Sequence, residues 1–355
     1  MQELKINYPQ KTVLFSFVLE IITFDKPNKK GLSRMRELFQ LLKKGNKSAF
    51  IAACVNTIIA ILKGVAFFIT GNVAMFAETL HSLGDAANQL FVFIGSALSK
   101  KSPTDRFPNG FGRLVNLVLL GAVLIVGIMS YETVKEGIHH ILHPVESEGI
   151  LINLSVLSIA VLLEMYVLFK AMKEVLHETG IEAKGLAIFY KSFGALKRAK
   201  PATKLVFMED MVATSGGLLA IIAILLARFT PFDTAEGFAS AIIGLMMFFV
   251  VGRVFLDNAA GALGEADHDM QLKIGQMVMN DPDVRDIQEL MVIKEGEDFH
   301  VELEVELDPS ITLAQADDIK DRLRTAILNE RGVTNVTIEF DEDDKVPQWQ
   351  TADLE

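Results

Sequence analysis

Apolar residues along this chain gather in six long stretches, separated by short segments that carry Pro, Gly or charged residues. Each stretch approaches the roughly 20 residues that a helix needs to cross the hydrocarbon core of a bilayer. Pro, Gly and charges between such stretches favour turns and loops. The pattern predicts a membrane domain of six helices over residues 48–260, at about 48–70, 73–98, 114–132, 150–172, 205–227 and 235–257.

A different pattern follows residue 261. Apolar and charged residues alternate from Phe299 to Leu307, which indicates a half-buried strand, and apolar residues then recur at helical spacing from Leu313 to Ile327. The pattern predicts an αββαβ order, and therefore an α+β domain over residues 261–340. The other expected elements are a helix at about 267–280 and strands at about 284–294 and 333–340, followed by an acidic, disordered tail at 341–355.

Charge separates the same two parts. Residues 265–355 hold 25 Asp or Glu against 8 Lys or Arg, a net charge of −17, whereas the remainder of the chain sums to +6. Half of all residues are apolar and the mean hydropathy is +0.34, which is high for a soluble protein of this size. These numbers predict a membrane part with basic flanks and an acidic soluble part.

The distribution of Lys and Arg predicts the orientation. There are ten in an N-terminal arm at 1–47, four at 99–113 and eight at 170–204, but one each at 133–149 and 228–234. Positive charge in short loops stays on the cytoplasmic side, so both termini are expected there. The apolar segment Thr12–Phe24 is too short to span a membrane and is assigned to the arm.

A polar stripe interrupts the second apolar stretch. Glu78, His81, Asp85 and Asn88 follow one another at spacings of three, four and three residues, which places them on one face of a helix. A carboxylate in hydrocarbon costs several kcal/mol unless it is paired, solvated or bound to a cation. The stripe therefore predicts an ion pathway, against the alternative of hydrogen bonding between helices.

The fifth stretch supplies two more carboxylates, Glu209 and Asp210. Adjacent residues lie about 100° apart on a helix, so one of the two should point at the second helix, and we expect this to be Asp210. Thr214, Gly216 and Gly217 follow and permit close helix approach. Because the only cysteine, Cys54, lies in an apolar run, any metal site must use oxygen and nitrogen donors.

A shell of His81, Asp85 and Asp210 suits a borderline divalent ion such as Zn²⁺ and could accept Mn²⁺, Fe²⁺ or Co²⁺. The fourth ligand is open between Glu209, Glu78, Asn88 and water. Two further groups have ordinary structural explanations that we weigh against functional ones. Asn56 and Lys63 share one face of the first helix and could pair with these acids, and His139, His140 and His143 are expected to be solvated at a helix end rather than to bind metal.

Several segments form a recognisable combination. They are GNKSA before the first helix, HSLGD in the second, PTDRFPNGFGR after it, FMEDMVATSGG in the fifth, the Gly264–Glu265 pair after the sixth, and the αββαβ order. With these segments the chain resembles the cation diffusion facilitators. The resemblance covers nearly the whole chain. It implies six helices and a cytoplasmic ferredoxin-like domain in a homodimer that exchanges a divalent metal for protons, with His81, Asp85 and Asp210 at the places of the family's membrane ligands.

The chain also departs from the family pattern. Val206 stands four residues before Asp210, where many members have the histidine of another HxxxD motif, so the chain resembles the branch with a Glu-Asp pair in helix five. Phe107 and Phe111 replace two histidines of the loop after helix two. Glu339 and Asp341 stand roughly where a His and an Asp occur in the C-terminal domain. These departures argue against a metal site in the loop and weigh against one in the C-terminal domain, where metal binding is left open.

The predicted function is export of a divalent metal, zinc first, by proton antiport across the bilayer, in a bacterial inner membrane. A metal-sensing receptor or scaffold without transport, and a related transporter selective for manganese or iron, are the alternatives. No P-loop and no HExxH motif is present, so neither an ATP-driven pump nor a zinc hydrolase is predicted, and the protein is not expected to be an enzyme. No nucleic-acid partner is expected.

Overall fold

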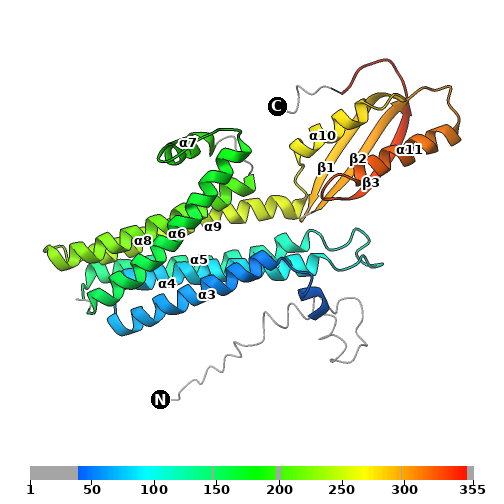
Figure 1. Cartoon of the computed structure of the whole chain (residues 1–355). Coiled ribbons are helices and arrows are strands. Elements are labelled where there is room, and N and C mark those ends of the chain that lie inside the picture. The colour runs from blue at the N-terminus through cyan, green and yellow to red at the C-terminus, as the bar shows by residue number, and fades with distance from the viewer. Residues whose placement is uncertain (1–38, 146–147, 197–200, 297, 350–355) are drawn as a thin grey trace, which may run out of the picture. The chain divides into compact units, whose positions relative to one another are not determined.

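The computed structural model describes residues 39–145, 148–196, 201–296 and 298–349. The N-terminal part of the arm, with Thr12–Phe24, lies outside these residues. The described part contains six long helices, joined by short connections apart from the segment that carries the nine-residue helix α7 (Ala187–Ala195) (Figure 1). They are α3 (Lys47–Thr70), α4 (Val73–Ser99), α5 (Leu114–Leu142), α6 (Ile150–Glu178), α8 (Pro201–Phe229) and α9 (Ala235–Leu263).

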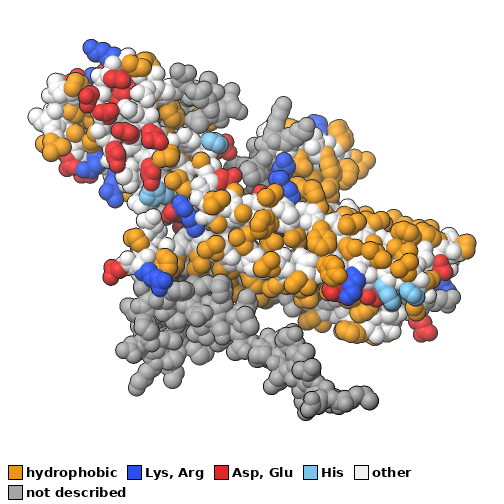
Figure 2. Space-filling view, turned by 180° about the vertical axis from the view of Figure 1, so that it is seen from behind, with side chains coloured by type: hydrophobic (Ala, Val, Ile, Leu, Met, Phe, Trp, Pro, Cys, Tyr) orange, Lys and Arg blue, Asp and Glu red, His pale blue; other side chains and the backbone are white. Residues whose placement is uncertain are grey.

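Five of the six long helices are long and apolar enough to cross a membrane. Helix α4 is not among them, because its polar stripe lowers its hydropathy although the helix has 27 residues. Large apolar side chains cover the outside of the helical part, including Phe68 at 85%, Leu151 at 77% and Leu124 at 70% exposure (Figure 2). A soluble protein does not expose apolar surface on this scale, so the helical part is a membrane domain.

The interior of the membrane domain is built from small residues. Ala66, Ala77, Ala220 and Ala239 belong to one buried cluster that joins α3, α4, α8 and α9. Small side chains let helix backbones approach closely, which is the main source of helix association in lipid. Charged side chains are also buried here: Lys63 and Glu78 are both 0% exposed.

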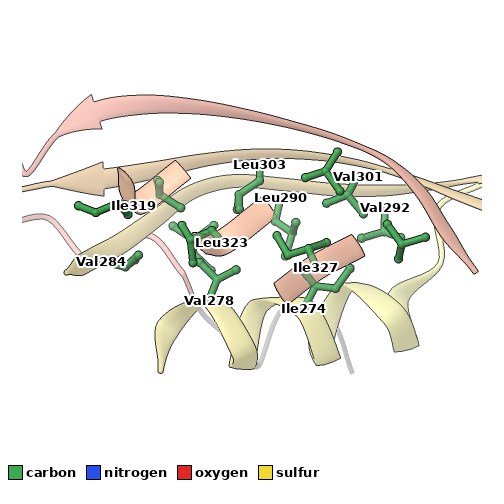
Figure 3. Close-up of a cluster of buried hydrophobic side chains, with 14 of the residues drawn as sticks. Ile274, Val278, Val284, Leu290, Val292, Val301, Leu303, Ile319, Leu323 and Ile327 are labelled. Atoms are coloured by element: carbon green, nitrogen blue, oxygen red, sulfur yellow. The ribbon is translucent and has the colours of Figure 1, made fainter. Parts of the chain in front are cut away.

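The C-terminal domain follows the predicted αββαβ order, which the structure confirms. Its sheet has the order β1-β2-β3, antiparallel between β1 and β2 and parallel between β2 and β3. Both helices pack on one face of the sheet through a core that includes Ile274, Val301, Leu303 and Ile327 (Figure 3). The elements are α10 (His268–Met279), β1 (Val284–Glu295), β2 (Asp298–Leu307), α11 (Leu313–Leu328) and β3 (Val333–Glu342).

Side-chain hydrogen bonds cap the N-terminal ends of α10 and α11. Asp267 precedes α10 and accepts a hydrogen bond from the backbone N–H of Met270. Thr312 precedes α11 and forms a capping box with Gln315. Such caps satisfy backbone donors that the first helical turn leaves unpaired.

The other face of the sheet is acidic. Glu304 of β2 pairs in register with Glu289 of β1 and with Glu339 of β3, so three carboxylates form a row across the sheet. With Glu302 they line an open groove of about 240 Å³. Figure 2 shows acidic side chains gathered on this domain. Like charges directly opposite one another are unfavourable, so this face is not built for stability alone.

The expectation of disorder from Asp341 onward is wrong for residues 341–349. Strand β3 continues to Glu342, and the chain then returns to the domain. Trp349 packs on the core, with its ring against Gly275, and its backbone N–H donates to Asp286. A large aromatic side chain stabilises the segment by burial, which the acidic composition of the tail concealed. Residues 350–355 lie outside the described part.

Candidate metal centre

Two members of the predicted polar stripe, His81 and Asp85, meet on α4. His81 is 6% exposed, and its Nε2 atom is 3.6 Å from Oδ2 of Asp85, one helical turn further on. The spacing of four residues brings the two side chains together on the same face. Nε2 of His81 is buried and makes no hydrogen bond within the described residues. A buried ring nitrogen without a hydrogen bond is costly, so this atom is a candidate to bind a ligand.

Helix α8 adds Glu209 to this pair. His81, Asp85 and Glu209 line one cavity of about 30 Å³, whose remaining walls are apolar side chains of α5, α8 and α9. A second cavity of about 30 Å³ is lined by Asp85, Asn88 and Glu209. The structure therefore brings Glu209 to the stripe.

Asp210 lies on the same helix but in neither cavity. Its Oδ2 atom is buried and has no hydrogen-bond partner among the residues that the structure describes, and its carboxyl group interacts electrostatically with Asp85. Across the described ranges, no group of three or more His, Cys, Asp or Glu side chains is close enough to hold a metal ion. The four predicted donors thus surround one region without converging on a single point, and the preference for Asp210 over Glu209 stays a prediction.

Glu78, the remaining candidate ligand, is engaged elsewhere. Its Oε2 atom is 2.7 Å from Nζ of Lys63 on α3, and the same Nζ is 3.1 Å from Oε1 of Glu164 on α6. The pairing considered for Lys63 is therefore present. Sequence reasoning missed Glu164, although an acid inside the apolar stretch at 150–172 was a visible signal.

The other candidates have structural explanations. The rings of Phe107 and Phe111 contact each other, with centroids 5.2 Å apart. His140 is buried, and its Nε2 lies 3.2 Å from the backbone oxygen of Val145, while the rings of His139 and His143 stack with centroids 5.0 Å apart. The expectation of solvated histidines is therefore wrong for His140, which is buried, whereas His139 and His143 are exposed.

Comparison with known families gives two matches. Residues 49–261 match the cation efflux transmembrane domain, and residues 266–343 match the cytoplasmic domain of cation efflux proteins. Together these segments contain the six long helices and the αββαβ domain.

Three relatives illustrate the similarity. The human mitochondrial proton-coupled zinc antiporter SLC30A9 is 26% identical over 81% of this chain and 50% of its own length. The magnetosome protein MamM of Paramagnetospirillum magneticum is 24% identical over 78% of this chain and 82% of its own. The zinc transporter ZitB of Yersinia pseudotuberculosis is 23% identical over 83% of this chain and 88% of its own.

The chain spans about half the length of the SLC30A9 relatives that it matches. The family itself rests on the transmembrane match, which covers more than half of the chain. The chain therefore belongs to the cation efflux family, a family of transporters and not of enzymes, as HSLGD and the αββαβ order had indicated.

Proposed function

We propose that this protein exports a divalent transition-metal ion, zinc before the others, from the cytoplasm in exchange for protons. The observation that carries the proposal is the cavity lined by His81, Asp85 and Glu209 inside a membrane domain. Ionisable groups at such a depth face a water-filled or ion-filled path in membrane proteins. Two of the relatives described above are zinc transporters by name, which supports the choice of metal.

The geometry of the first two donors fits a zinc ion. With zinc–nitrogen and zinc–oxygen bonds of about 2.0–2.1 Å, two ligands of one tetrahedral ion lie about 3.3 Å apart. The separation of 3.6 Å between His81 Nε2 and Asp85 Oδ2 is close to that value. We propose that one carboxylate of α8, Asp210 or Glu209, completes the shell. We leave Glu78 out of the proposed shell, because it is paired with Lys63.

Exchange follows from the chemistry of these donors. Imidazole and carboxylate groups bind metal only when they are deprotonated, so metal and protons compete for the same atoms. A site open to the cytoplasm loses protons when it binds metal. Opened to a more acidic outer side, it takes up protons and releases the metal. Rocking of helices around a fixed midplane site would alternate the two openings.

The Lys and Arg distribution supports an orientation with both termini in the cytoplasm. We also propose that the protein works as a homodimer in a bacterial inner membrane, as the match to the cytoplasmic domain of its family suggests. Light scattering on the purified protein in detergent tests the dimer, which a mass of one chain would contradict.

The test of transport uses purified protein in lipid vesicles. Uptake of Zn²⁺, Mn²⁺, Fe²⁺ and Co²⁺ is measured with and without a pH gradient. We expect His81→Ala and Asp85→Asn to lower zinc uptake at least about tenfold, since even outer-shell changes cost metal sites that much. His177→Ala and Asp233→Asn are matched controls, because both side chains are exposed and lie far along the chain from these donors.

Glu209→Gln and Asp210→Asn, made separately, decide which carboxylate of α8 is the ligand. Normal uptake in His81→Ala and Asp85→Asn would show that the ion takes another path. Metal binding without any flux in the wild type would favour the alternative of a metal-sensing receptor.

A further inference from the structure

Three charged side chains meet inside the membrane domain, apart from the proposed metal site. Lys63 of α3 lies between Glu78 of α4 and Glu164 of α6, with Nζ–O distances of 2.7 and 3.1 Å. Lys63 and Glu78 are 0% exposed, and the side chain of Glu164 is 14% exposed. We call these three residues the triad.

The charges of the triad do not balance. One ammonium group faces two carboxylates, which leaves one negative charge in excess. The second oxygen of each carboxylate, Oε1 of Glu78 and Oε2 of Glu164, is buried and has no hydrogen-bond partner within the described residues. A buried, uncompensated charge costs several kcal/mol. A further positive group at these oxygens would offset the excess charge.

Helix α8 packs against these oxygens with two glycines. A Cβ atom on Gly216 would lie 2.8 Å from Oε1 of Glu78, and one on Gly217 would lie 3.4 Å from Oε2 of Glu164. A Cβ on Gly216 would press on the carboxyl group of Glu78, whereas the close contact at Gly217 would be 2.5 Å from Val161. The two glycines thus bring the backbone of α8 beside both free oxygens.

Other charged groups act on the triad from two sides. His81 of α4 and Asp210 of α8 interact electrostatically with Glu164, while α9 presents the apolar Ile243 beside Gly216. Asp210 adds negative charge, and His81 belongs to the proposed metal shell. Neither supplies a lasting counter-charge for the free oxygens.

We propose that the triad binds one proton, shared between the carboxyl groups of Glu78 and Glu164, and so forms a proton site separate from the metal site. A proton from hydronium attaches to a free carboxylate oxygen and leaves water, with no other bond made or broken. The occupied triad then holds one ammonium, one carboxylate and one neutral carboxyl group. A divalent metal fits less well, because the ammonium of Lys63 already lies between the carboxylates and would repel it.

The position of the triad along α4 suggests that it receives protons from the outside. This part of the inference rests on the proposed function. Glu78 lies three residues before His81, about 4.5 Å along the helix axis toward the start of α4. In the proposed orientation that end faces the outside. A proton entering from there meets the triad before it meets His81.

Infrared spectroscopy of the metal-free protein in lipid tests the proton directly. A protonated carboxyl group absorbs apart from a carboxylate, and its band shifts in D₂O. We expect Glu164→Gln and Glu78→Gln each to remove the same band. In Lys63→Met both carboxylates lose their counter-charge, so about twice the wild-type intensity is expected from this pair. Glu174→Gln, on the exposed side of the same helix, is the matched control and should leave the band unchanged.

An unchanged band in both glutamine variants would overturn the proposal. So would a Glu164-dependent band that disappears on addition of Zn²⁺ to Asp210→Asn, because the triad would then bind metal. Circular dichroism shows whether each variant is folded, and Lys63→Met gives a gain of signal that misfolding cannot imitate. These spectra need no transport, so a wild type without zinc flux would refute the proposed function and leave the triad tested.

Discussion

An arginine of the C-terminal domain is held by two carboxylates at once. The guanidinium of Arg322 donates to both oxygens of Asp281, at 2.8 and 2.6 Å, and to Asp283 at 2.6 Å. These hydrogen bonds, with the charge of Arg322, lower the pKa of Asp281 below its ordinary value. A carboxyl group whose pKa is lowered in the folded state stabilises that state above its unfolded pKa, and loses this effect as the pH falls through the folded pKa.

We therefore expect Arg322→Met to lower the melting temperature of this domain at neutral pH. The difference from the wild type should persist down to about pH 4, the ordinary pKa of Asp, and close below it. Arg324→Met is the control, because Arg324 is exposed on the same helix. Burial raises the pKa of Glu306. This residue is present in the wild type and in both variants, so it does not change the difference in melting temperature between them. A difference that is constant with pH would contradict the role of Asp281.

At the residue scale, residue spacing predicted which side chains meet on one helix. It did not predict which side chains of different helices meet. The meeting of His81 with Asp85 follows from a separation of four residues on α4. The position of Glu209 beside them depends on how α8 is rotated, which no local pattern fixes. The same is true of Glu164, whose partner Lys63 is 101 residues away along the chain.

Helices α5 and α9 approach each other through glycines. A Cβ atom on Gly137 of α5 would lie 2.5 Å from the backbone nitrogen of Ala241 on α9, and one on Gly244 would lie 2.6 Å from Val134. Backbone atoms cannot move aside as flexible side chains do. Close contact of this kind is how helices pack in lipid.

Gly137→Ala should therefore destabilise the membrane domain by about 1–3 kcal/mol, the usual cost of overpacking. Gly252→Ala is the control on α9, since a Cβ there meets nothing within 4 Å. Thermal aggregation of the detergent-solubilised protein, followed by size-exclusion chromatography, compares the two. If Gly137→Ala were as stable as Gly252→Ala, the close packing of α5 against α9 would not contribute to stability.

At the scale of elements, alternation and helical spacing were sufficient for the C-terminal domain. Its two helices and three strands fall within a few residues of the predicted limits. The long helices instead run past their apolar stretches, as α5 does from 132 to Leu142, because polar residues outside the hydrocarbon continue the same helix. Disorder was wrongly predicted for residues 341–349, because burial of the Trp349 side chain stabilises this segment despite its acidic residues.

The whole molecule consists of a membrane domain and a C-terminal domain, each with a buried core of its own. Trp349 is the only tryptophan of the chain, and it packs on the core of the C-terminal domain. Its fluorescence therefore reports the unfolding of that domain alone. Circular dichroism mainly follows the six long helices. A chain with two cores need not unfold in one step, so the two signals can separate.

A core substitution tests this independence. Ile327 is 0% exposed in the core of the C-terminal domain, and Ile327→Ala should cost about 2–5 kcal/mol through lost burial and the cavity left behind. We expect the fluorescence transition to move to lower urea while the main loss of helix stays in place. Leu313→Ala is the control on the same helix, because Leu313 is 86% exposed. A common shift of both signals in Ile327→Ala would show that the two domains unfold as one unit, with the C-terminal core supporting the membrane helices.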